Sequence, residues 1–320
     1  MKKQLGIWKF VRKSFEESIP VMILFVLESK GSSPGRQGFF MAVNANNMEG
    51  SIGGGIMEHK FVEMAKEQLQ AASYKLQVKQ QIHDKAAAKN QSGMICSGEQ
   101  TILIYRIQKK DINHIEKIIA TLEQKKNGTL HLSTDGILFE DKLPAKDFVF
   151  SLKNEDDWTY TENIGYKNHL YVVGGGHCAL AFSKLMSEMD FYIHLFEDRE
   201  GLNTMEANNY VHEKTVVKDY SDLAQQIPSG ENNYVVVMTF GYRTDDIAIR
   251  ALMQKQFKYF GLLGSKKKIE KMFAEYRKEG IEEEVLTKIY SPIGISIKSQ
   301  SPEEIAISIA AEIIEVKNEI

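Results

Sequence analysis

The stretch that decides the fold is Leu170–Arg199, which reads LYVVGGGHCALAFSKLMSEMDFYIHLFEDR. It begins with a short apolar run that is long enough for a buried strand, and three glycines follow. The next segment, Ala179–Met189, has apolar residues at the spacing of one helix face. A second apolar run, Phe191–Phe196, ends in acidic residues. Strand, glycine turn, helix, strand and acid in this order predict a βαβ unit with parallel strands.

The glycines of this stretch have a mechanical reason. Gly174 permits the sharp turn out of the strand, and Gly176, which follows Gly175, lets the backbone approach a phosphate. The start of the next helix offers free N–H groups and a partial positive charge to an anion. The pattern favours a bound nucleotide or similar anion, although glycine turns also close βαβ units that bind nothing.

Two charged residues after the second strand bear on the choice of nucleotide. Asp198 follows the first glycine, Gly174, by 24 residues. In dinucleotide-binding units, the acid that binds the ribose follows the first glycine by roughly 20 residues. Arg199, beside Asp198, suits a 2′-phosphate instead. NAD and NADP both stay open as ligands.

The composition places the chain among ordinary globular proteins. Its 320 residues favour two domains, and 43% hydrophobic and 26% charged residues are usual values. A net charge of −3 gives no general attraction to nucleic acid or to anionic membranes. The apolar run Val21–Leu27 is too short to span a bilayer, and the start of the chain does not have the pattern of a signal peptide. Two cysteines build no disulfide framework, so we expect a cytoplasmic protein, and a homodimer as the commonest assembly.

A second glycine cluster lies in the first half of the chain. The segment Gly50–Gly55 reads GSIGGG and leads directly into a helical pattern, so an anion can again bind at a helix start. An earlier loop carries hydroxyls and a guanidinium that would face the same point if the intervening strands pair. The alternative is that these glycines only permit a tight turn. The candidate residues are Ser32, Ser33, Arg36, Gly53, Gly54 and Gly55.

Cys96 lies at the junction between a polar loop and the predicted strand Gln100–Ile107, beside Gly98. A cysteine in this position can be exposed enough to act as a nucleophile, a sulfur carrier or a soft metal ligand. The alternative is a small buried core residue. The residues alone leave both open.

The rest of the chain completes the predicted architecture. We expect an N-terminal α+β domain over residues 1–160 and a C-terminal Rossmann-like domain over residues 161–320. The run Tyr234–Thr239 is apolar throughout, as in a parallel strand covered on both faces. Asp245, Ser265 and Ser301 each precede or begin a helical pattern and are expected to cap it. The fold class is therefore α/β with two domains.

The motifs together resemble those of the xanthine dehydrogenase accessory factor family (XdhC/CoxI), and the resemblance covers nearly the whole chain. Single glycine motifs are weak, but their number and order make the match specific. The motifs that carry it are Gly31-Ser-Ser-Pro34, Gly50-Ser-Ile-Gly-Gly-Gly55 with Glu58, Cys96-Ser-Gly98, Val172-Val-Gly-Gly-Gly-His177, Asp198-Arg199, Gly261-Leu-Leu-Gly-Ser265, Pro292-Ile-Gly294 and Ser301-Pro-Glu-Glu-Ile-Ala306.

The resemblance implies a role in the maturation of molybdenum hydroxylases such as xanthine dehydrogenase. Family members are understood to bind the molybdenum cofactor (molybdopterin), to protect it during sulfuration and to pass it to the apo-enzyme, with a cysteine desulfurase as a further expected partner. Carried onto this chain, the resemblance implies an N-terminal site with Ser32, Ser33, Gly53–Gly55, Glu58 and Cys96, where Cys96 serves as catalytic thiol and metal ligand. It also implies a C-terminal site with Gly174–His177, Asp198 and Arg199.

Three positions depart from the family pattern. Many relatives have a cysteine directly after the glycine triplet, where this chain has Ile56. The middle residue of the Cys-Gly-Gly motif of relatives is Ser97, and Phe240 stands where relatives often carry histidine. The missing cysteine removes one soft ligand, and the client enzyme can differ from xanthine dehydrogenase. An NAD(P)-dependent oxidoreductase and a nucleotide-sensing scaffold remain the competing hypotheses.

Overall fold

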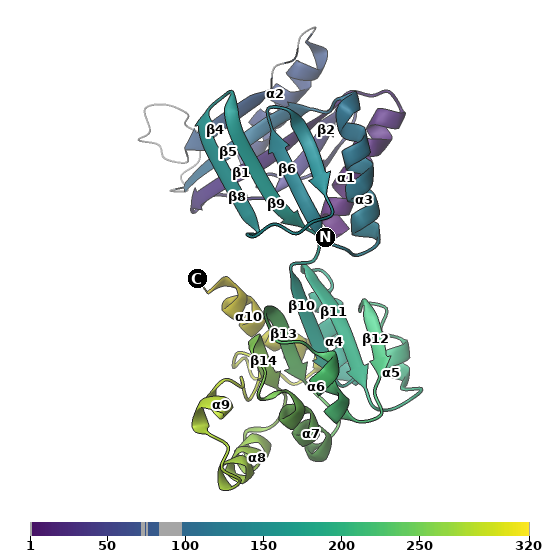
Figure 1. The fold of residues 1–320 in the computed structure, drawn as a ribbon, viewed down its shortest axis with the longest axis vertical. Coiled ribbons are helices and arrows are strands. Elements are labelled where there is room, and N and C mark those ends of the chain that lie inside the picture. The colour runs from purple at the N-terminus through teal and green to yellow at the C-terminus, as the bar shows by residue number, and fades with distance from the viewer. Residues whose placement is uncertain (1, 72–73, 75, 83–97, 320) are drawn as a thin grey trace. The chain divides into compact units, whose positions relative to one another are not determined.

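The computed structural model describes residues 2–71, 74, 76–82 and 98–319. The chain divides into two compact units, Met1–Gly165 and Tyr166–Ile320 (Figure 1). The division falls a few residues beyond the boundary expected between residues 160 and 161, which would cut through strand β9 (Asp157–Ile164).

The first unit contains a five-stranded antiparallel sheet in the order β3-β2-β1-β5-β4. Helix α2 packs on one face of this sheet, where Phe61 and Ala65 meet Leu24 and Ile102 in a fully buried cluster. The prediction of an α+β unit is confirmed for the described residues. The elements are β1 (Val21–Gly31), β2 (Phe40–Asn44), β3 (Met48–Gly50), α2 (Gly55–Gln70), β4 (Gln77–Ile82) and β5 (Gly98–Arg106).

A second, four-stranded sheet in the order β7-β6-β9-β8 completes the first unit. The rings of Phe25 on β1 and Tyr160 on β9 lie 5.2 Å apart, so the two sheets are in contact. Trp8 of the first helix packs on Phe40 of β2 with a ring separation of 5.0 Å. The remaining elements are α1 (Lys2–Glu16), η1 (Lys109–Asp111), α3 (Ile112–Glu123), β6 (Gly128–Ser133), β7 (Gly136–Glu140) and β8 (Phe148–Asn154).

The second unit is built on a parallel five-stranded sheet in the order β12-β11-β10-β13-β14. The predicted Rossmann-like sheet is therefore confirmed. Its strands and first helices are β10 (Asn168–Val173), α4 (His177–Met186), β11 (Phe191–Glu197), α5 (Asn203–Glu206), β12 (Glu213–Val216), η2 (Tyr220–Asp222), α6 (Leu223–Gln226), β13 (Gly230–Val237) and β14 (Phe257–Leu262). The other helices are α7 (Tyr242–Leu252), α8 (Lys266–Lys278), α9 (Glu283–Thr287) and α10 (Pro302–Asn318).

Helices cover both faces of this parallel sheet, which explains why its strands are apolar throughout. Phe182 of α4 and Ile309 of α10 belong to the cluster on one face. Ile249 of α7 and Met272 of α8 belong to the cluster on the other face. The loops that follow β10, β11 and β13 meet at the carboxyl edge of the sheet, where ligands of doubly wound folds bind. Within the described part of the chain, no helix combines the length and apolar character needed to span a membrane.

Candidate functional site at the glycine-rich turns

The turn between β10 and α4 contains one glycine that the fold requires and one that it does not. Gly174 has φ 106°, and a Cβ there would lie 2.5 Å from the carbonyl oxygen of Met238. Gly176, the N-cap of α4, has φ −72° and ψ −171°, an extended conformation that any residue adopts. A Cβ on Gly176 would meet no atom within 4 Å. The fold explains Gly174, whereas Gly176 keeps open space beside the start of α4.

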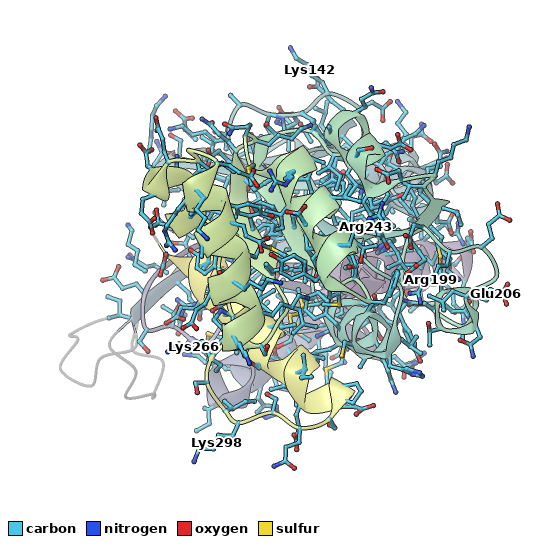
Figure 2. All side chains as sticks on the ribbon, turned by 90° about the horizontal axis from the view of Figure 1, so that it is seen from below. Lys142, Arg199, Glu206, Arg243, Lys266 and Lys298 are labelled. Atoms are coloured by element: carbon cyan, nitrogen blue, oxygen red, sulfur yellow. The ribbon has the colours of Figure 1, made fainter. Side chains whose placement is uncertain are left out.

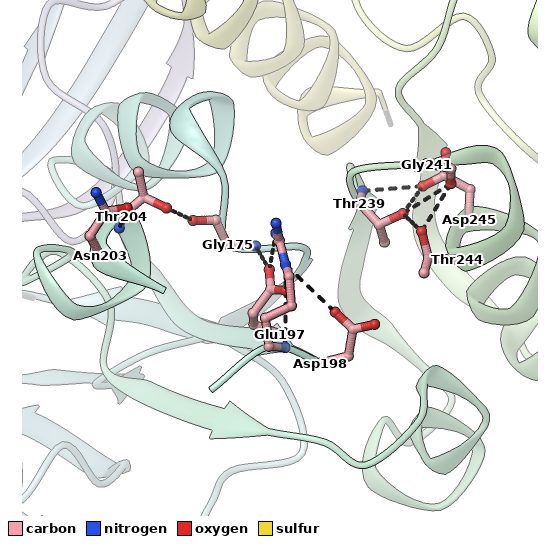
Figure 3. Close-up of polar contacts among 10 residues, drawn as sticks. Gly175, Glu197, Asp198, Asn203, Thr204, Thr239, Gly241, Thr244 and Asp245 are labelled. Atoms are coloured by element: carbon pink, nitrogen blue, oxygen red, sulfur yellow. Dashed lines mark hydrogen bonds and ion pairs between the residues drawn. The ribbon is translucent and has the colours of Figure 1, made fainter. Parts of the chain in front are cut away.

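The second glycine of this turn is bonded to an acid from the neighbouring strand. The amide of Gly175 donates to Oε2 of Glu197 at 2.6 Å, and Glu197 is fully buried (Figure 3). The carbonyl of Gly175 accepts from Oγ1 of Thr204 at 2.6 Å. The chain therefore supplies its own anion to one of the N–H groups that the sequence predicted for a ligand.

Arg199 neutralises this buried carboxylate. Its Nε lies 2.6 Å from Oε1 of Glu197, and its Nη2 lies 3.1 Å from Oε2. The guanidinium carbon also lies 4.6 Å from the centre of the Phe240 ring, which is 66% exposed. A planar guanidinium suits both contacts, because it pairs with carboxylates in a fork and stacks on aromatic faces. Arg199 is therefore already paired, rather than free for a 2′-phosphate.

The two neighbouring acids have opposite pKa shifts. Burial by itself would raise the pKa of Glu197. Hydrogen bonds from Arg199 and from the Gly175 amide have a larger, opposite effect, so its pKa lies below the ordinary value. Burial and the neighbouring Glu197 raise the pKa of Asp198. Oδ1 of Asp198, predicted as the ribose acid, lies 3.9 Å from Nε of Arg199. Glu197 instead occupies the position beside the glycine turn.

Strand alternation is the signal that identifies Glu197. Phe191, Ile193 and Leu195 point to the face of the sheet that α4 covers. Glu197 continues that alternation, so its side chain reaches the turn before α4, while Asp198 points to the other side. The prediction of Asp198 rests on its distance from the first glycine, and this distance does not distinguish adjacent residues.

A second polar network lies after β13 at the same edge of the sheet (Figure 3). Oδ1 of Asp245 accepts from the amide of Thr239 at 3.1 Å and from its hydroxyl at 2.6 Å. The other oxygen, Oδ2, pairs with Nζ of Lys268. Burial raises the pKa of Asp245, while Lys268 and Thr239 oppose the shift. The prediction that Asp245 caps α7 is wrong, because Gly241 is the N-cap and Asp245 is buried one turn further on.

Arginine side chains also lie at this edge. Figure 2, which views the molecule from below, labels Arg199 and Arg243 on this side of the second unit. Arg243 lies in the first turn of α7 and is exposed. It lies near enough to lower the pKa of Asp219 on the neighbouring loop, although hydrogen bonds from Ser221 have the larger effect.

In the first unit, the two predicted loops pack directly against each other. A Cβ on Gly53 would lie 2.4 Å from the amide nitrogen of Gly35, and one on Gly35 would lie 2.0 Å from the carbonyl oxygen of Ile52. Gln100 joins the loops, because its Nε2 donates to the carbonyl of Gly35 at 2.9 Å and to that of Ile52 at 3.4 Å. The structure thus brings the segments 31–38 and 50–55 together, and Gly53 is required for their approach.

The polar side chains of the first loop are used within that loop. Oγ of Ser33 donates to the carbonyl of Gly35 at 3.0 Å and is buried. Nη1 of Arg36 donates to the carbonyl of Gly31 at 3.0 Å. Ser32 is exposed. Hydrogen bonds from Ser33 and Arg36 to carbonyls of the same loop therefore stabilise its conformation without a ligand.

Glu58 occupies the amides of the glycine-rich turn before α2. Its Oε2 accepts from the amides of Ile52 at 2.8 Å and of Gly54 at 3.1 Å, and from Oγ of Ser51 at 2.6 Å. The amide of Gly53 donates to the same Ser51 hydroxyl at 3.0 Å. An internal carboxylate therefore takes the place that the sequence predicted for an external anion.

Some predicted residues remain accessible. Gly54 and Gly55 have φ of 77° and 71°, and a Cβ on either would have no atom within 4 Å. Ile56, which follows them, is 69% exposed. His177, at the start of α4, is also exposed. These positions form the open parts of the two turns.

The thiol and metal predictions fall on Cys96, which lies outside the described residues. The other cysteine, Cys178, is a free thiol in α4. Burial and the charge of Glu303 raise its pKa, so it is a poor nucleophile. Among the described residues, no group of three or more histidine, cysteine, aspartate or glutamate side chains is arranged to hold a metal ion.

Fold and site define a two-unit α/β protein with a Rossmann unit and glycine-rich turns in both halves. Residues 170–313 match the model of the XdhC Rossmann domain. Residues 15–78 match the model of the XdhC and CoxI family. The chain belongs to this family.

Known proteins of similar sequence include two bacterial relatives. The uncharacterized protein YqeB of Escherichia coli (strain K12) is 23% identical over 98% of this chain and 47% of its own length. A probable xanthine dehydrogenase subunit of Bacillus subtilis (strain 168) is 33% identical over 85 residues, 27% of this chain and 24% of that protein. This chain therefore matches about half of the first relative and a quarter of the second.

A solved structure supports the fold along the whole chain. It is described as a xanthine dehydrogenase from Bacillus halodurans and aligns with a TM-score of 0.69 at 21% identity. The alignment covers 97% of this chain and 95% of that one. At this identity the likeness establishes the shared architecture of both units.

Proposed function

We propose that this protein is an accessory protein that binds molybdenum cofactor and assists its sulfuration and insertion into a xanthine dehydrogenase-type molybdenum hydroxylase. The observation that carries the proposal is family membership, since the XdhC and CoxI models match segments in both units. The name of the Bacillus subtilis relative points to the same enzyme system. The client enzyme is accordingly proposed to be a molybdenum hydroxylase.

The geometry of the second unit supports a role in holding a ligand. Gly176 has no backbone or packing requirement for glycine, yet it leaves open space at the start of α4. A bare backbone at a helix start allows an anionic group to approach the remaining free N–H groups. A ligand contact is the simplest reason for glycine at this position.

In the proposed mechanism, Cys96 lies near the metal or the sulfur of the bound cofactor, and a cysteine desulfurase supplies the sulfur. A thiolate can carry sulfur as a persulfide or bind a soft metal. We expect Cys96→Ala to reduce the fraction of sulfurated cofactor, while Cys178→Ala, the matched control, leaves it unchanged. Equal sulfuration in both variants would remove Cys96 from the mechanism.

The test of cofactor binding uses the full chain expressed in two hosts, one that makes molybdopterin and one that does not. The protein is purified without oxygen, and the small molecules released on denaturation are identified by mass spectrometry. We expect molybdopterin only in protein from the first host. Absence of any pterin from that protein would contradict the proposed function.

The second candidate function is that of an NAD(P)-dependent oxidoreductase. The strand order of the parallel sheet and the open space at Gly176 before α4 favour it, because a dinucleotide binds at this edge of a Rossmann sheet. Titration with NAD and NADP by calorimetry separates the candidates. Tight binding together with reduction of a small carbonyl compound would favour the oxidoreductase.

A further inference from the structure

A cavity of about 730 Å³ lies in the first unit, and the described residues that line it do not include the glycine-rich turn before α2. It borders the outer side of β4, the edge strand of the five-stranded sheet, with α2 on one side and the turn between β8 and β9 on the other. Its volume is in the range of small-molecule sites. The lining residues are Lys60, Met64, Val78, Lys79, Gln80, Gln81, Thr101, Leu152, Lys153, Asn154 and Glu155.

The charges that line this cavity favour an anion. Three lysines from three elements contribute to it, against one glutamate. Lys153 pairs with Asp157 at 2.9 Å. Within the part of the chain that the structure describes, Lys60 on α2 and Lys79 on β4 have no acidic partner. Two lysines are thus available to a ligand, in contrast to Arg199, which Glu197 already neutralises.

The side-chain amide of Gln81, in the same wall, has a buried oxygen without a hydrogen-bond donor among the described residues. Gln81 is 6% exposed, and its Nε2 donates to the carbonyl of Gln80 at 3.2 Å. Its Oε1 is buried without a hydrogen-bond partner among the described residues. Buried polar atoms are normally paired, so the free oxygen indicates a missing N–H or O–H donor. A lysine on an edge strand also discourages strand pairing between molecules, but that role does not account for Gln81.

Strand alternation places these groups together. Lys79 and Gln81 are two residues apart on β4, so their side chains leave the same face of the strand. That is the face α2 covers, and Lys60 reaches the cavity from this helix. The apolar side chain of Met64, also from α2, completes this end of the wall. The arrangement offers two cations, one hydrogen-bond acceptor and apolar surface.

We propose that this cavity binds a phosphorylated heterocycle that carries N–H donors. The phosphate binds Lys60 and Lys79, and a ring N–H donates to Oε1 of Gln81. Where the heterocycle is the pterin of molybdenum cofactor, the inference rests on the proposed function and gives that ligand a site other than the glycine-rich turns. The site itself is defined by the chemistry of its walls.

The test uses the fluorescent pterin neopterin monophosphate, titrated into the full chain, with inorganic phosphate as competitor. Wild-type protein is expected to bind it saturably. Lys60→Glu/Lys79→Glu should raise the Kd at least tenfold, and Gln81→Leu should raise it several-fold while leaving competition by inorganic phosphate unchanged. Lys117→Glu, an exposed lysine on α3 outside the cavity, is the matched control and should leave the Kd unchanged.

Circular dichroism establishes that each variant is folded, and Lys60→Ala/Lys79→Ala replaces the charge reversal if that pair fails to fold. Lack of saturable binding by wild-type protein, or equal affinity in wild-type and doubly substituted protein, would overturn the proposed site. The proposed function is tested separately by copurified molybdopterin. Its retention in Lys60→Glu/Lys79→Glu would leave the function standing and reject this cavity. Binding of neopterin monophosphate without any copurified molybdopterin would support the cavity and reject the function.

Discussion

Both glycine-rich turns of this protein are closed by a glutamate, but the two glutamates come from different places. The turn after β3 is closed by Glu58, which lies in the first turn of the helix that the glycines introduce. The turn after β10 is closed by Glu197, which lies at the end of the neighbouring strand. A helix start attracts negative charge because its N–H groups are unpaired. Such a turn is open to an external anion only where the chain has not supplied an acid of its own.

The two acids also differ in burial and pairing. Glu58 is partly exposed and accepts from two amides and a hydroxyl. Glu197 is fully buried and is paired with Arg199, which in turn lies on Phe240. Removing one partner of a buried charge pair leaves the other uncompensated, which costs more than losing exposed hydrogen bonds. The comparison predicts that the second turn depends more strongly on its acid than the first.

Glu197→Ala is expected to have the largest effect on stability. It leaves the Gly175 amide unpaired in the interior and removes the partner of Arg199, so the free energy of unfolding should fall by about 3 kcal/mol. This is the lower end of the usual range, because Arg199 reaches solvent. Urea unfolding followed by circular dichroism measures the change. Glu200→Ala, its exposed neighbour, is the control and should change stability by less than about 0.5 kcal/mol.

Glu58→Ala is expected to have an intermediate effect. The turn loses its carboxylate, but the amide contacts of Glu58 are only partly buried and water can reach some of them, so the cost should be about 1–2 kcal/mol. Glu67→Ala, an exposed acid on the same helix, provides the control. The comparison of the two turns would break if Glu58→Ala cost as much as Glu197→Ala in the same urea experiment.

The pH dependence of stability sharpens the comparison further. The pKa of Glu197 is lower in the folded protein, so its contribution is present above the unfolded value of about 4.3 and is lost as the pH falls through the folded value. The stability difference between wild type and Glu197→Gln should therefore be full between about pH 5 and 7 and shrink below about pH 4.3. Unfolding curves at several pH values test this. A difference that stays constant down to about pH 3 would show that the charge of Glu197 contributes nothing.

Gly176→Ala is expected to have the smallest effect on stability. Because Gly176 has φ −72° and open space around its Cα, the unfolding free energy should change by less than about 1 kcal/mol, in either direction. A ligand that approaches the start of α4 would nevertheless lose affinity, which titration with NAD can detect. Loss of stability well above that value would show that the fold, rather than a ligand, requires glycine here.

The sequence predicts the second unit well because its signals are local. Apolar strands such as Tyr234–Thr239 and the glycine turn follow directly from residue spacing, and the caps of two helices are confirmed. Oγ of Ser265 accepts from the Lys268 amide at 3.3 Å. Ser301 and Glu304 form the reciprocal hydrogen bonds of a capping box. Each of these features depends on residues within one or two turns of the chain.

The first unit shows what such reasoning misses. The predicted boundary between residues 160 and 161 lies close to the acidic run Glu155-Asp-Asp157, yet strand β9 begins at the last residue of this run. Its alternate side chains Trp158 and Tyr160 are buried, and the buried acid Glu162 accepts from the hydroxyl of Tyr160 at 2.9 Å. Glu162 interrupts the alternation of apolar and polar residues by which a half-buried strand is identified in a sequence. The sequence does not show that Tyr160 pairs with this acid in the interior.

The candidate site could be predicted only in part for the same reason. Glycine spacing locates both turns, and the loop with Ser33 does pack against the loop with Gly53. The sequence does not show that Glu58 and Glu197 occupy the amides, because a carboxylate that fills a turn and one that binds a ligand have the same spacing. The lysines that line the cavity beside β4, Lys60, Lys79 and Lys153, come from three separate elements, and no sequence motif joins them.

The most direct measurement is a crystal structure of the full chain purified with molybdopterin bound. We predict that the cofactor phosphate lies within hydrogen-bonding distance of Lys60 and Lys79, while Glu58 and Glu197 keep their contacts with the turn amides. A phosphate bound to the amides of Gly54 or Gly175, with its glutamate displaced, would contradict this arrangement.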